Sequence, residues 1–197
     1  MKKIVLSETG VETSVSVLYD ALQKPGAVIL VPTETVYGLV ARAGDEVAYR
    51  RIYALKQRPF EKRLGWFIGD WRKLSGFGVD MSGLPERLAE QFFPGALTII
   101  APRYDGGTQG IRVPDHPLLK SLLDKIGEPL IQTSANASGQ RDPLSCIEAV
   151  SQLSGEVDCA VDGGVLPADA CGSTVVDACG TVLKILRQGA VDLHNWR

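Results

Sequence analysis

Residues 129–139, Pro-Leu-Ile-Gln-Thr-Ser-Ala-Asn-Ala-Ser-Gly, pass from an apolar run into hydroxyl groups, an amide and a glycine. The apolar part predicts a buried strand, and the polar part then lies where that strand ends. Open α/β sheets place ligands at such strand ends, and a turn of small residues lets backbone N–H groups approach an anion. An ordinary polar loop after a strand explains the same residues equally well, so these residues alone do not distinguish a ligand site from a loop.

Strand-like and helix-like segments alternate on both sides of this stretch. Residues 27–31 and 36–41 are short apolar runs typical of buried strands. Residues 11–22 carry apolar side chains at the spacing of one helix face. Further strands are predicted at 4–6, 64–68, 96–101, 157–161, 173–176 and 181–186, and further helices at 71–74, 85–93, 117–126 and from 145 onward. No internal repeat or low-complexity linker appears, so we expect one α/β domain over residues 1–197.

The composition is that of an ordinary globular protein. Of the 197 residues, 45% are hydrophobic and 22% are charged, which is enough apolar sequence for a sizeable core. The formal net charge of −2 argues against a nucleic-acid binder that works by bulk charge. No apolar run is long enough to span a membrane and no secretory signal is present, so we expect a cytoplasmic protein.

The cysteines predict neither a zinc site nor a disulfide framework. They stand at positions 146, 159, 171 and 179, without a Cys-x-x-Cys pair or clustered histidines. We therefore expect free thiols and no metal held by the protein itself.

A helix is predicted to begin at Asp45, which can cap it, and to end near residue 57. Its apolar positions Val47, Ile52 and Leu55 are expected to face inward.

Four cations lie at and just beyond the end of that helix: Lys56, Arg58, Lys62 and Arg63. Cations at a helix C-terminus complement the helix dipole, which accounts for one or two of them. Four within eight residues indicate an anion instead, and a triphosphate is the natural candidate.

A second polar segment, Pro32-Thr33-Glu34-Thr35, separates two predicted strands. Threonines beside a turn are commonly β-formers only, so in isolation the segment does not establish a site.

A lone arginine, Arg112, lies in the apolar run Ile111–Pro114 and needs a partner. An internal acid and a bound carboxylate are both possible partners. Residues 104–110, which contain three glycines, are expected to form a flexible loop and are the best candidate for a lid. His116 is a candidate catalytic base, although a capping or packing histidine is the more common role at such a position.

Seven separated motifs resemble those of the YrdC family, in the same order, between about residues 9 and 189. They are Pro32-Thr33-Glu34-Thr35-Val36-Tyr37-Gly38-Leu39, Lys56-Gln57-Arg58-Pro59, Pro94-Gly95-Ala96-Leu97-Thr98, Arg112-Val113-Pro114-Asp115-His116-Pro117, Thr133-Ser134-Ala135-Asn136, Ser173-Thr174-Val175-Val176-Asp177 and Leu186-Arg187-Gln188-Gly189. Each motif is weak alone, and together they are specific. The combination Lys-x-Arg with Ser-x-Asn resembles the threonylcarbamoyl-AMP synthases of the family, whereas proteins of the YciO type depart from it at Ser-x-Asn.

The resemblance implies a fold and a reaction. The fold is a mixed, twisted sheet flanked by helices, with a positively charged cleft. The reaction is that of a nucleotidyltransferase: L-threonine, bicarbonate and ATP, with Mg²⁺ brought by ATP, give threonylcarbamoyl-AMP and pyrophosphate. Other proteins then transfer the threonylcarbamoyl group to transfer RNA, with which a weak direct contact is possible.

The resemblance also implies roles for individual residues. Lys56 and Arg58 are expected to be catalytic and to bind the phosphates. The other residues expected on the ATP side are Lys62, Thr108, Asn136, Leu144 and Arg187. The residues expected to bind threonine are Thr35, Arg112, Ser134 and Ser173.

Two positions differ from the longer synthases of the family. Lys62 stands where they carry Asn, which keeps a phosphate role plausible, and Phe67 stands where they carry His. Because Phe67 cannot hydrogen-bond threonine, only a packing role carries over. Short bacterial members share the Lys-Gln-Arg-Pro-x-x-Lys pattern, so we interpret both differences as features of that subgroup.

Two other functions compete with the synthase. One is an RNA-binding module of the same fold without synthase activity, which the negative net charge disfavours. The other is a carbamoyl-transfer domain like that of hydrogenase-maturation proteins, which belongs to much longer chains.

Overall fold

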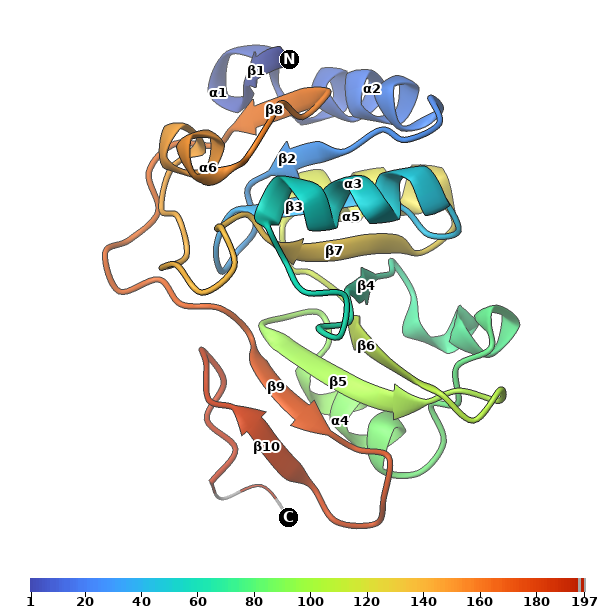
Figure 1. Ribbon diagram of the computed structural model, residues 1–197. Helices are drawn as coiled ribbons and strands as arrows, with labels where there is room; N and C mark the ends of the chain where they lie inside the picture. The colour runs from blue at the N-terminus through green and yellow to red at the C-terminus, as the bar shows by residue number, and fades with distance from the viewer. Residues whose placement is uncertain (195, 197) are drawn as a thin grey trace.

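The computed structural model describes residues 1–194 and 196, and its strands form one ten-stranded mixed sheet with the order β1-β8-β2-β3-β7-β4-β6-β5-β9-β10 (Figure 1). The strands are β1 (Lys2–Val5), β2 (Ile29–Val31), β3 (Gly38–Arg42), β4 (Gly65–Phe67), β5 (Leu97–Pro102), β6 (Thr108–Arg112), β7 (Leu130–Ser134), β8 (Cys159–Asp162), β9 (Thr174–Asp177) and β10 (Lys184–Arg187). The mixed α/β sheet predicted from the sequence is confirmed.

Helices cover the sheet on both faces. They are α1 (Leu6–Thr9), α2 (Val11–Leu22), α3 (Glu46–Lys56), the 3₁₀-helix η1 (Trp71–Phe77), α4 (Leu84–Phe92), α5 (Pro117–Ile126) and α6 (Cys146–Gln152). No helix in the described part of the chain is both long and apolar enough to cross a bilayer. All four cysteines are free thiols, as expected.

Strand β2 shows why a continuous apolar run forms the middle of a sheet. Leu30 packs with α3 and α6 on one face, while Ile29 and Val31 pack with α2 and α5 on the other. Side chains alternate between the faces of a strand, so a strand covered on both faces must be apolar at every position. All three residues of β2 are completely buried.

The second half of the sheet has its own core. Strands β5 and β6 pack against α4 and η1, with Leu88, Leu97 and Ile111 fully buried between them. Figure 1 shows this half, with β5, β6, β9 and β10, below the half that contains β1, β8, β2 and β3. Strands β7 and β4 pair directly and join the two halves.

The prediction that Val47 faces the core is wrong, since its side chain is 62% exposed. Ile52 and Leu55 are buried as predicted. At about 100° per residue, position 47 lies about 140° around the helix from position 52. The helix begins as predicted, because the Asp45 side chain accepts a hydrogen bond from the Ala48 N–H at 2.9 Å.

The prediction of a flexible loop over residues 104–110 is wrong for its second half. Residues 108–110 belong to β6, which pairs antiparallel with β5. The turn between the strands is short and hydrogen-bonded: Arg103 N donates to Gly107 O at 2.8 Å, and Gly107 N donates to Asp105 Oδ1 at 3.0 Å. This stretch is therefore a tight hairpin.

Candidate functional site

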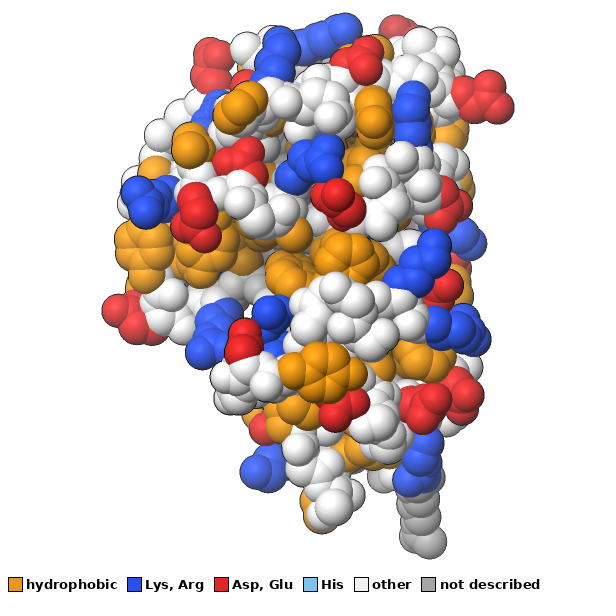
Figure 2. All heavy atoms as spheres, turned by 90° about the vertical axis from the view of Figure 1, so that its right-hand side faces the viewer, with side chains coloured by type: hydrophobic (Ala, Val, Ile, Leu, Met, Phe, Trp, Pro, Cys, Tyr) orange, Lys and Arg blue, Asp and Glu red, His pale blue; other side chains and the backbone are white. Residues whose placement is uncertain are grey.

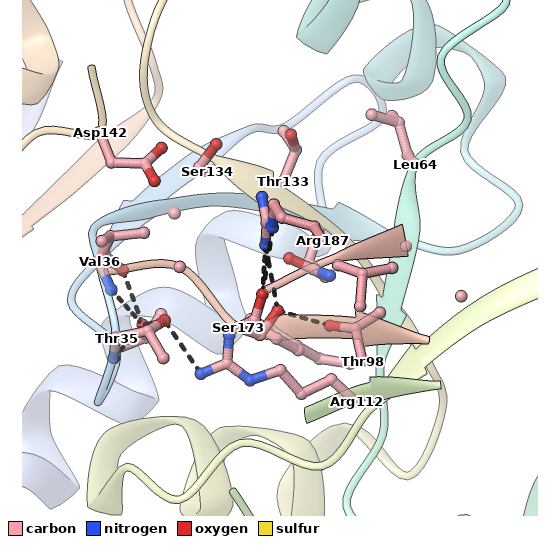
Figure 3. Close-up of a pocket in the computed structure, with 18 of the residues that line it drawn as sticks. Thr35, Val36, Leu64, Thr98, Arg112, Thr133, Ser134, Asp142, Ser173 and Arg187 are labelled. Atoms are coloured by element: carbon pink, nitrogen blue, oxygen red, sulfur yellow. Dashed lines mark hydrogen bonds between the residues drawn. The ribbon is translucent and has the colours of Figure 1, made fainter. Parts of the chain in front are cut away.

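A cavity of about 250 Å³ opens where the ends of β7, β4 and β6 face the β9–β10 hairpin. Six of the eleven candidate site residues line it, and they come from distant parts of the chain: Thr35, Arg58, Arg112, Ser134, Ser173 and Arg187. Figure 3 shows most of these side chains converging on the same space. The polar end of the 129–139 stretch therefore lies at a cavity.

Arg112 is held by protein groups although it lines the cavity. Its side chain is only 4% exposed, and Nη2 lies 2.6 Å from Glu34 Oε1. Nη2 also donates to Thr35 Oγ1 at 3.1 Å, and Nε donates to Gly95 O at 3.1 Å. Of the two partners that the sequence allowed, the structure shows the internal acid. The remaining terminal nitrogen, Nη1, makes no hydrogen bond with the described residues and is available to a ligand.

The ring of Phe67 lies beside this guanidinium, with Arg112 Cζ 5.5 Å from its centroid. Phe67 is 1% exposed and pairs with Arg112 across β4 and β6. A cation over an aromatic face is attracted by the ring quadrupole. Phe67 therefore helps to position Arg112, beyond the packing role expected from the sequence.

The hydroxyl of Thr35 is oriented by Thr33. Thr33 Oγ1 donates to Val36 O at 2.7 Å, so its single proton is used there. In the 2.9 Å contact between the two hydroxyls, Thr35 is then the donor. Because Thr35 also accepts from Arg112, only a lone pair of its oxygen remains for the cavity. Thr35 thus offers an acceptor, suited to an ammonium or hydroxyl group.

Replacing Thr33 by valine keeps the side-chain shape and removes this orientation. We expect weaker binding of the amino acid implied by the sequence resemblance, because the Thr35 hydroxyl is no longer held as an acceptor. The free energy of unfolding should also fall by about 1–3 kcal/mol, because the buried groups around the Thr33 hydroxyl lose their partner. Calorimetric titration with that amino acid measures the loss of binding. Thr33→Ser, which keeps the hydroxyl, should bind nearly as tightly as the wild type. Equal binding by the valine and serine variants would show that the orientation has no effect.

Ser134 is oriented in the same way by Asn136 and Lys56. Ser134 Oγ donates to Asn136 Oδ1 at 2.5 Å, and the Asn136 amide donates to Gln140 O at 2.7 Å. Lys56 Nζ donates to Ser134 O, to Asn136 O at 2.5 Å and to Asn136 Oδ1 at 3.1 Å. Ser134 therefore also presents an acceptor to the cavity.

Lys56 itself lies behind the cavity wall. It is 1% exposed, and its three N–H donors face the Ser134–Asn136 turn. Burial, and then the charge of Arg58, lowers the pKa of Lys56 to about 7, against a smaller opposing effect of Asp142. In this structure Lys56 positions the turn, and it is not among the residues that line the cavity.

The β9–β10 hairpin supplies the opposite wall. Arg187, the last residue of β10, donates to Ser173 O through Nε at 3.1 Å and Nη2 at 2.7 Å. Ser173 Oγ lies 2.7 Å from Thr98 Oγ1, which is buried on β5 (Figure 3). Only glycine fits at position 189, because a Cβ there would overlap Gly172 O.

Arg58 lines the cavity and orders the segment that follows it. Its Nε donates to Lys62 O at 2.9 Å and its Nη2 donates to Arg63 O at 3.1 Å. Lys62 contributes its carbonyl to this arrangement, while its side chain is exposed outside the cavity.

Two other candidates also lie off this cavity. Thr108 lines a neighbouring hollow, where Arg63 donates to its carbonyl at 3.1 Å. Leu144 is half-buried and accepts a backbone hydrogen bond from Leu166 at 2.8 Å. The structure therefore brings together the candidates for the amino acid more completely than those for the nucleotide.

The cavity also contains residues that sequence reasoning did not select, among them Thr33, Thr98, Gln132 and Asp142. Thr33 and Thr98 lie within the motifs that resemble the YrdC family, and this position is a sequence signal that they belong to the site. Nothing in the sequence distinguishes Asp142 from other loop aspartates.

His116 does not line the cavity, and its Nδ1 is buried without a hydrogen-bond partner among the described residues. It precedes α5 and makes no side-chain cap. Burial lowers the pKa of His116, against smaller opposing effects of Glu34 and Asp115. These features favour the packing role over that of a catalytic base.

The lowered pKa of His116 predicts acid sensitivity. Below the usual histidine pKa the unfolded chain takes up a proton that the folded chain resists, so the free energy of unfolding should fall as pH falls through that range. Denaturant titrations at about pH 7.5 and about pH 5 measure the fall. It should be smaller in His116→Asn, and an equal fall in both proteins would contradict the assignment.

Comparison with known proteins agrees with the motif pattern. The family model Sua5_yciO_yrdC, described as "Telomere recombination", matches residues 21–189. The threonylcarbamoyl-AMP synthase of Pyrococcus abyssi is 33% identical over 181 residues, which cover 87% of this chain and 53% of that protein. This chain thus spans about half the length of that relative.

Two solved structures share the fold. The crystal structure of P. abyssi Sua5 complexed with L-threonine superposes with a TM-score of 0.78 at 30% identity, covering 89% of this chain and 54% of that one. Escherichia coli YciO superposes with a TM-score of 0.80 at 26% identity, covering 91% of this chain and 92% of that one. The sequence, the fold and the cavity agree, and the chain belongs to the Sua5/YciO/YrdC family.

Proposed function

We propose that the protein is a threonylcarbamoyl-AMP synthase that forms threonylcarbamoyl-AMP and pyrophosphate from L-threonine, bicarbonate and ATP. The observation that carries the proposal is the arrangement around Arg112. A buried guanidinium with one uncommitted nitrogen faces a cavity with two hydroxyl acceptors, Thr35 and Ser134. The name of the P. abyssi relative, threonylcarbamoyl-AMP synthase, and the L-threonine complex of P. abyssi Sua5 support the same substrate.

The amino acid fits this arrangement group by group. Arg112 Nη1 is placed to donate to a carboxylate. The acceptors on Thr35 and Ser134 suit the donors of an amino acid, namely its ammonium and its side-chain hydroxyl. Glu34 balances the positive charge of Arg112, and Arg187 adds a second positive charge nearby. The three groups together therefore keep one positive charge for an anionic group of the substrate.

Arg58 and Arg187 suit the phosphates of ATP. Guanidinium groups bind phosphate oxygens through paired hydrogen bonds and do not lose their charge. When Mg²⁺ is bound with ATP, it neutralises phosphate charge. The described residues contain no cluster of three or more His, Cys, Asp or Glu side chains. We expect Mg²⁺ to arrive with the nucleotide and to keep mainly phosphate and water ligands.

The chemistry then depends on alignment. An oxygen of the threonine carbamate attacks the α-phosphorus of ATP and pyrophosphate leaves, so no covalent bond to the protein is required. Holding the fragments together and neutralising the charge that develops on the phosphates lower the barrier. In a cell the product passes to proteins that transfer the threonylcarbamoyl group to transfer RNA.

The competing RNA-binding module has less support. On the face shown in Figure 2, Lys and Arg side chains alternate with Asp and Glu side chains and do not gather into one basic patch. The net charge of −2 also gives little bulk attraction to a phosphate backbone.

A series of amino acids tests the proposal. Initial rates of pyrophosphate release are compared for threonine, serine, valine and glycine at fixed ATP and bicarbonate. Serine lacks only the β-methyl group, so kcat/KM should fall about 10- to 200-fold. Valine lacks the hydroxyl and leaves the acceptors unpaired, so it should be far worse than serine. Valine matching serine would contradict the assignment of Thr35, Ser134 and Ser173 to this substrate.

A further inference from the structure

The proposed reaction produces a proton that some group must accept. Threonine enters with its amino group protonated, whereas the carbamate keeps a single N–H. Of the two protons lost, one leaves in water with the hydroxide of bicarbonate and the other needs a base. Such a base must face the cavity, and its assignment rests on the proposed function.

Most polar groups of the cavity cannot serve as this base. The guanidinium groups of Arg58, Arg112 and Arg187 stay protonated in proteins. The hydroxyl groups of Thr35 and Ser134 are poor bases and already donate to neighbours.

Two further titratable groups are placed badly for the task. The Lys56 ammonium points into the Ser134–Asn136 turn behind the wall. His116 does not line the cavity.

Asp142 remains, and it is the one carboxylate among the residues that line the cavity. It lies in the loop between β7 and α6 and is half-buried. Within residues 1–194 and 196 it makes no hydrogen bond and no ion pair, although four arginines line the same cavity. Figure 3 shows its carboxylate turned toward the interior.

Gly172 has no side chain, which leaves space beside the Asp142 carboxylate. A Cβ on Gly172 would lie 3.4 Å from Asp142 Oδ2 and 3.0 Å from Arg187 Nη2. Glycine at this position therefore leaves the carboxylate and the guanidinium uncovered on the cavity side. A substrate group can then approach both.

We propose that Asp142 is the general base that deprotonates the amino group of threonine. An N–H bond of the ammonium breaks, its electron pair stays on nitrogen, and the proton binds a carboxylate oxygen of Asp142. The free amine attacks the carbon of bicarbonate, so a C–N bond forms and a C–O bond breaks. The departing hydroxide takes a second proton from nitrogen and leaves as water. The proton on Asp142 then passes to solvent.

The charged groups around Asp142 are known, so the effect of removing its charge can be controlled. Arg58 and Arg63 reach the cavity from the segment after α3, Arg112 from β6 and Arg187 from β10. Lys56 lies behind the wall and interacts electrostatically with Asp142. A neutral residue at 142 makes the site more cationic, and a control must separate that effect from lost proton transfer.

The test is the rate of pyrophosphate release by Asp142→Asn as a function of pH. At about pH 7 we expect a fall of about 10²-fold, the usual contribution of a positioned base. Each pH unit raises the fraction of free amine in solution about tenfold below the amino pKa. The deficit should therefore shrink to less than about tenfold near pH 9. Asp142→Glu should restore part of the rate at neutral pH.

Controls separate the base from other roles. Asp169→Asn makes the same charge change at an exposed position outside the cavity and should leave the rate unchanged. A deficit that is independent of pH, one that excess Mg²⁺ relieves, or a normal rate at neutral pH would each overturn the proposal. If wild-type protein needs neither threonine nor bicarbonate, the proposed function has failed. If it needs both while Asp142→Asn is normal, only the base has been wrongly assigned.

Discussion

Replacing Arg58 by alanine is expected to lower kcat/KM for ATP by about 2–4 kcal/mol of transition-state stabilisation, about 30- to 1,000-fold. The reason is that Arg58 lines the cavity as a half-buried cation, where charge develops on the phosphates during the proposed reaction. The measurement is pyrophosphate release at varied ATP and saturating threonine and bicarbonate.

Stability provides the control for this variant. The hydrogen bonds of Arg58 to Lys62 O and Arg63 O lie at the surface and hold one segment, so unfolding should change by only about 1 kcal/mol. Arg58→Lys keeps the charge without the paired donors, so its kcat/KM for ATP should lie between those of the wild type and of Arg58→Ala. Normal activity in Arg58→Ala, or a failure to fold, would contradict the assigned role.

Replacing Arg112 by methionine is expected to lower the free energy of unfolding by about 3 kcal/mol and to abolish threonine binding. The substitution leaves the Glu34 carboxylate without its 2.6 Å partner, and an uncompensated charge on a side chain that is mostly covered by protein is destabilising. Glu34 is 19% exposed, which places the effect at the lower end of the range for buried pairs.

A double variant tests whether the unpaired charge is the cause. Arg112→Met combined with Glu34→Gln removes both charges and keeps an acceptor for Asp115 N, which donates to Glu34 at 3.0 Å. The double variant should regain about 1–3 kcal/mol relative to Arg112→Met alone. Urea titration followed by tryptophan fluorescence measures both. No recovery would show that the loss comes from packing around Arg112, and the charge pairing would then have no role.

The sequence predicted the fold better than it predicted the details of the site. A short run that is apolar at every position, as in β2, indicates a strand whose two faces are both buried. The Asp45 cap predicted where α3 begins. A ligand site at the end of β7 was predicted because an apolar strand that continues into small polar residues places those residues at the edge of the sheet.

Details that depend on three-dimensional direction could not be predicted. Thr108 and Arg112 lie on one strand, yet four residues at about 3.3 Å each separate them by about 13 Å, and Thr108 falls in a different hollow. Lys56 looks like a surface cation in the sequence, but it turns inward to bind three oxygens. Asp142 has no motif, because its position depends on how a loop folds over the cavity.

In the proposed reaction the nucleophile exists only when threonine and bicarbonate are both present. This requirement is tested most directly by measuring pyrophosphate release from ATP with L-threonine and bicarbonate omitted together, added singly and added together. Bicarbonate-free buffer is required for the single additions. We expect release only when both are present. Release at an equal rate without threonine would contradict the proposed reaction.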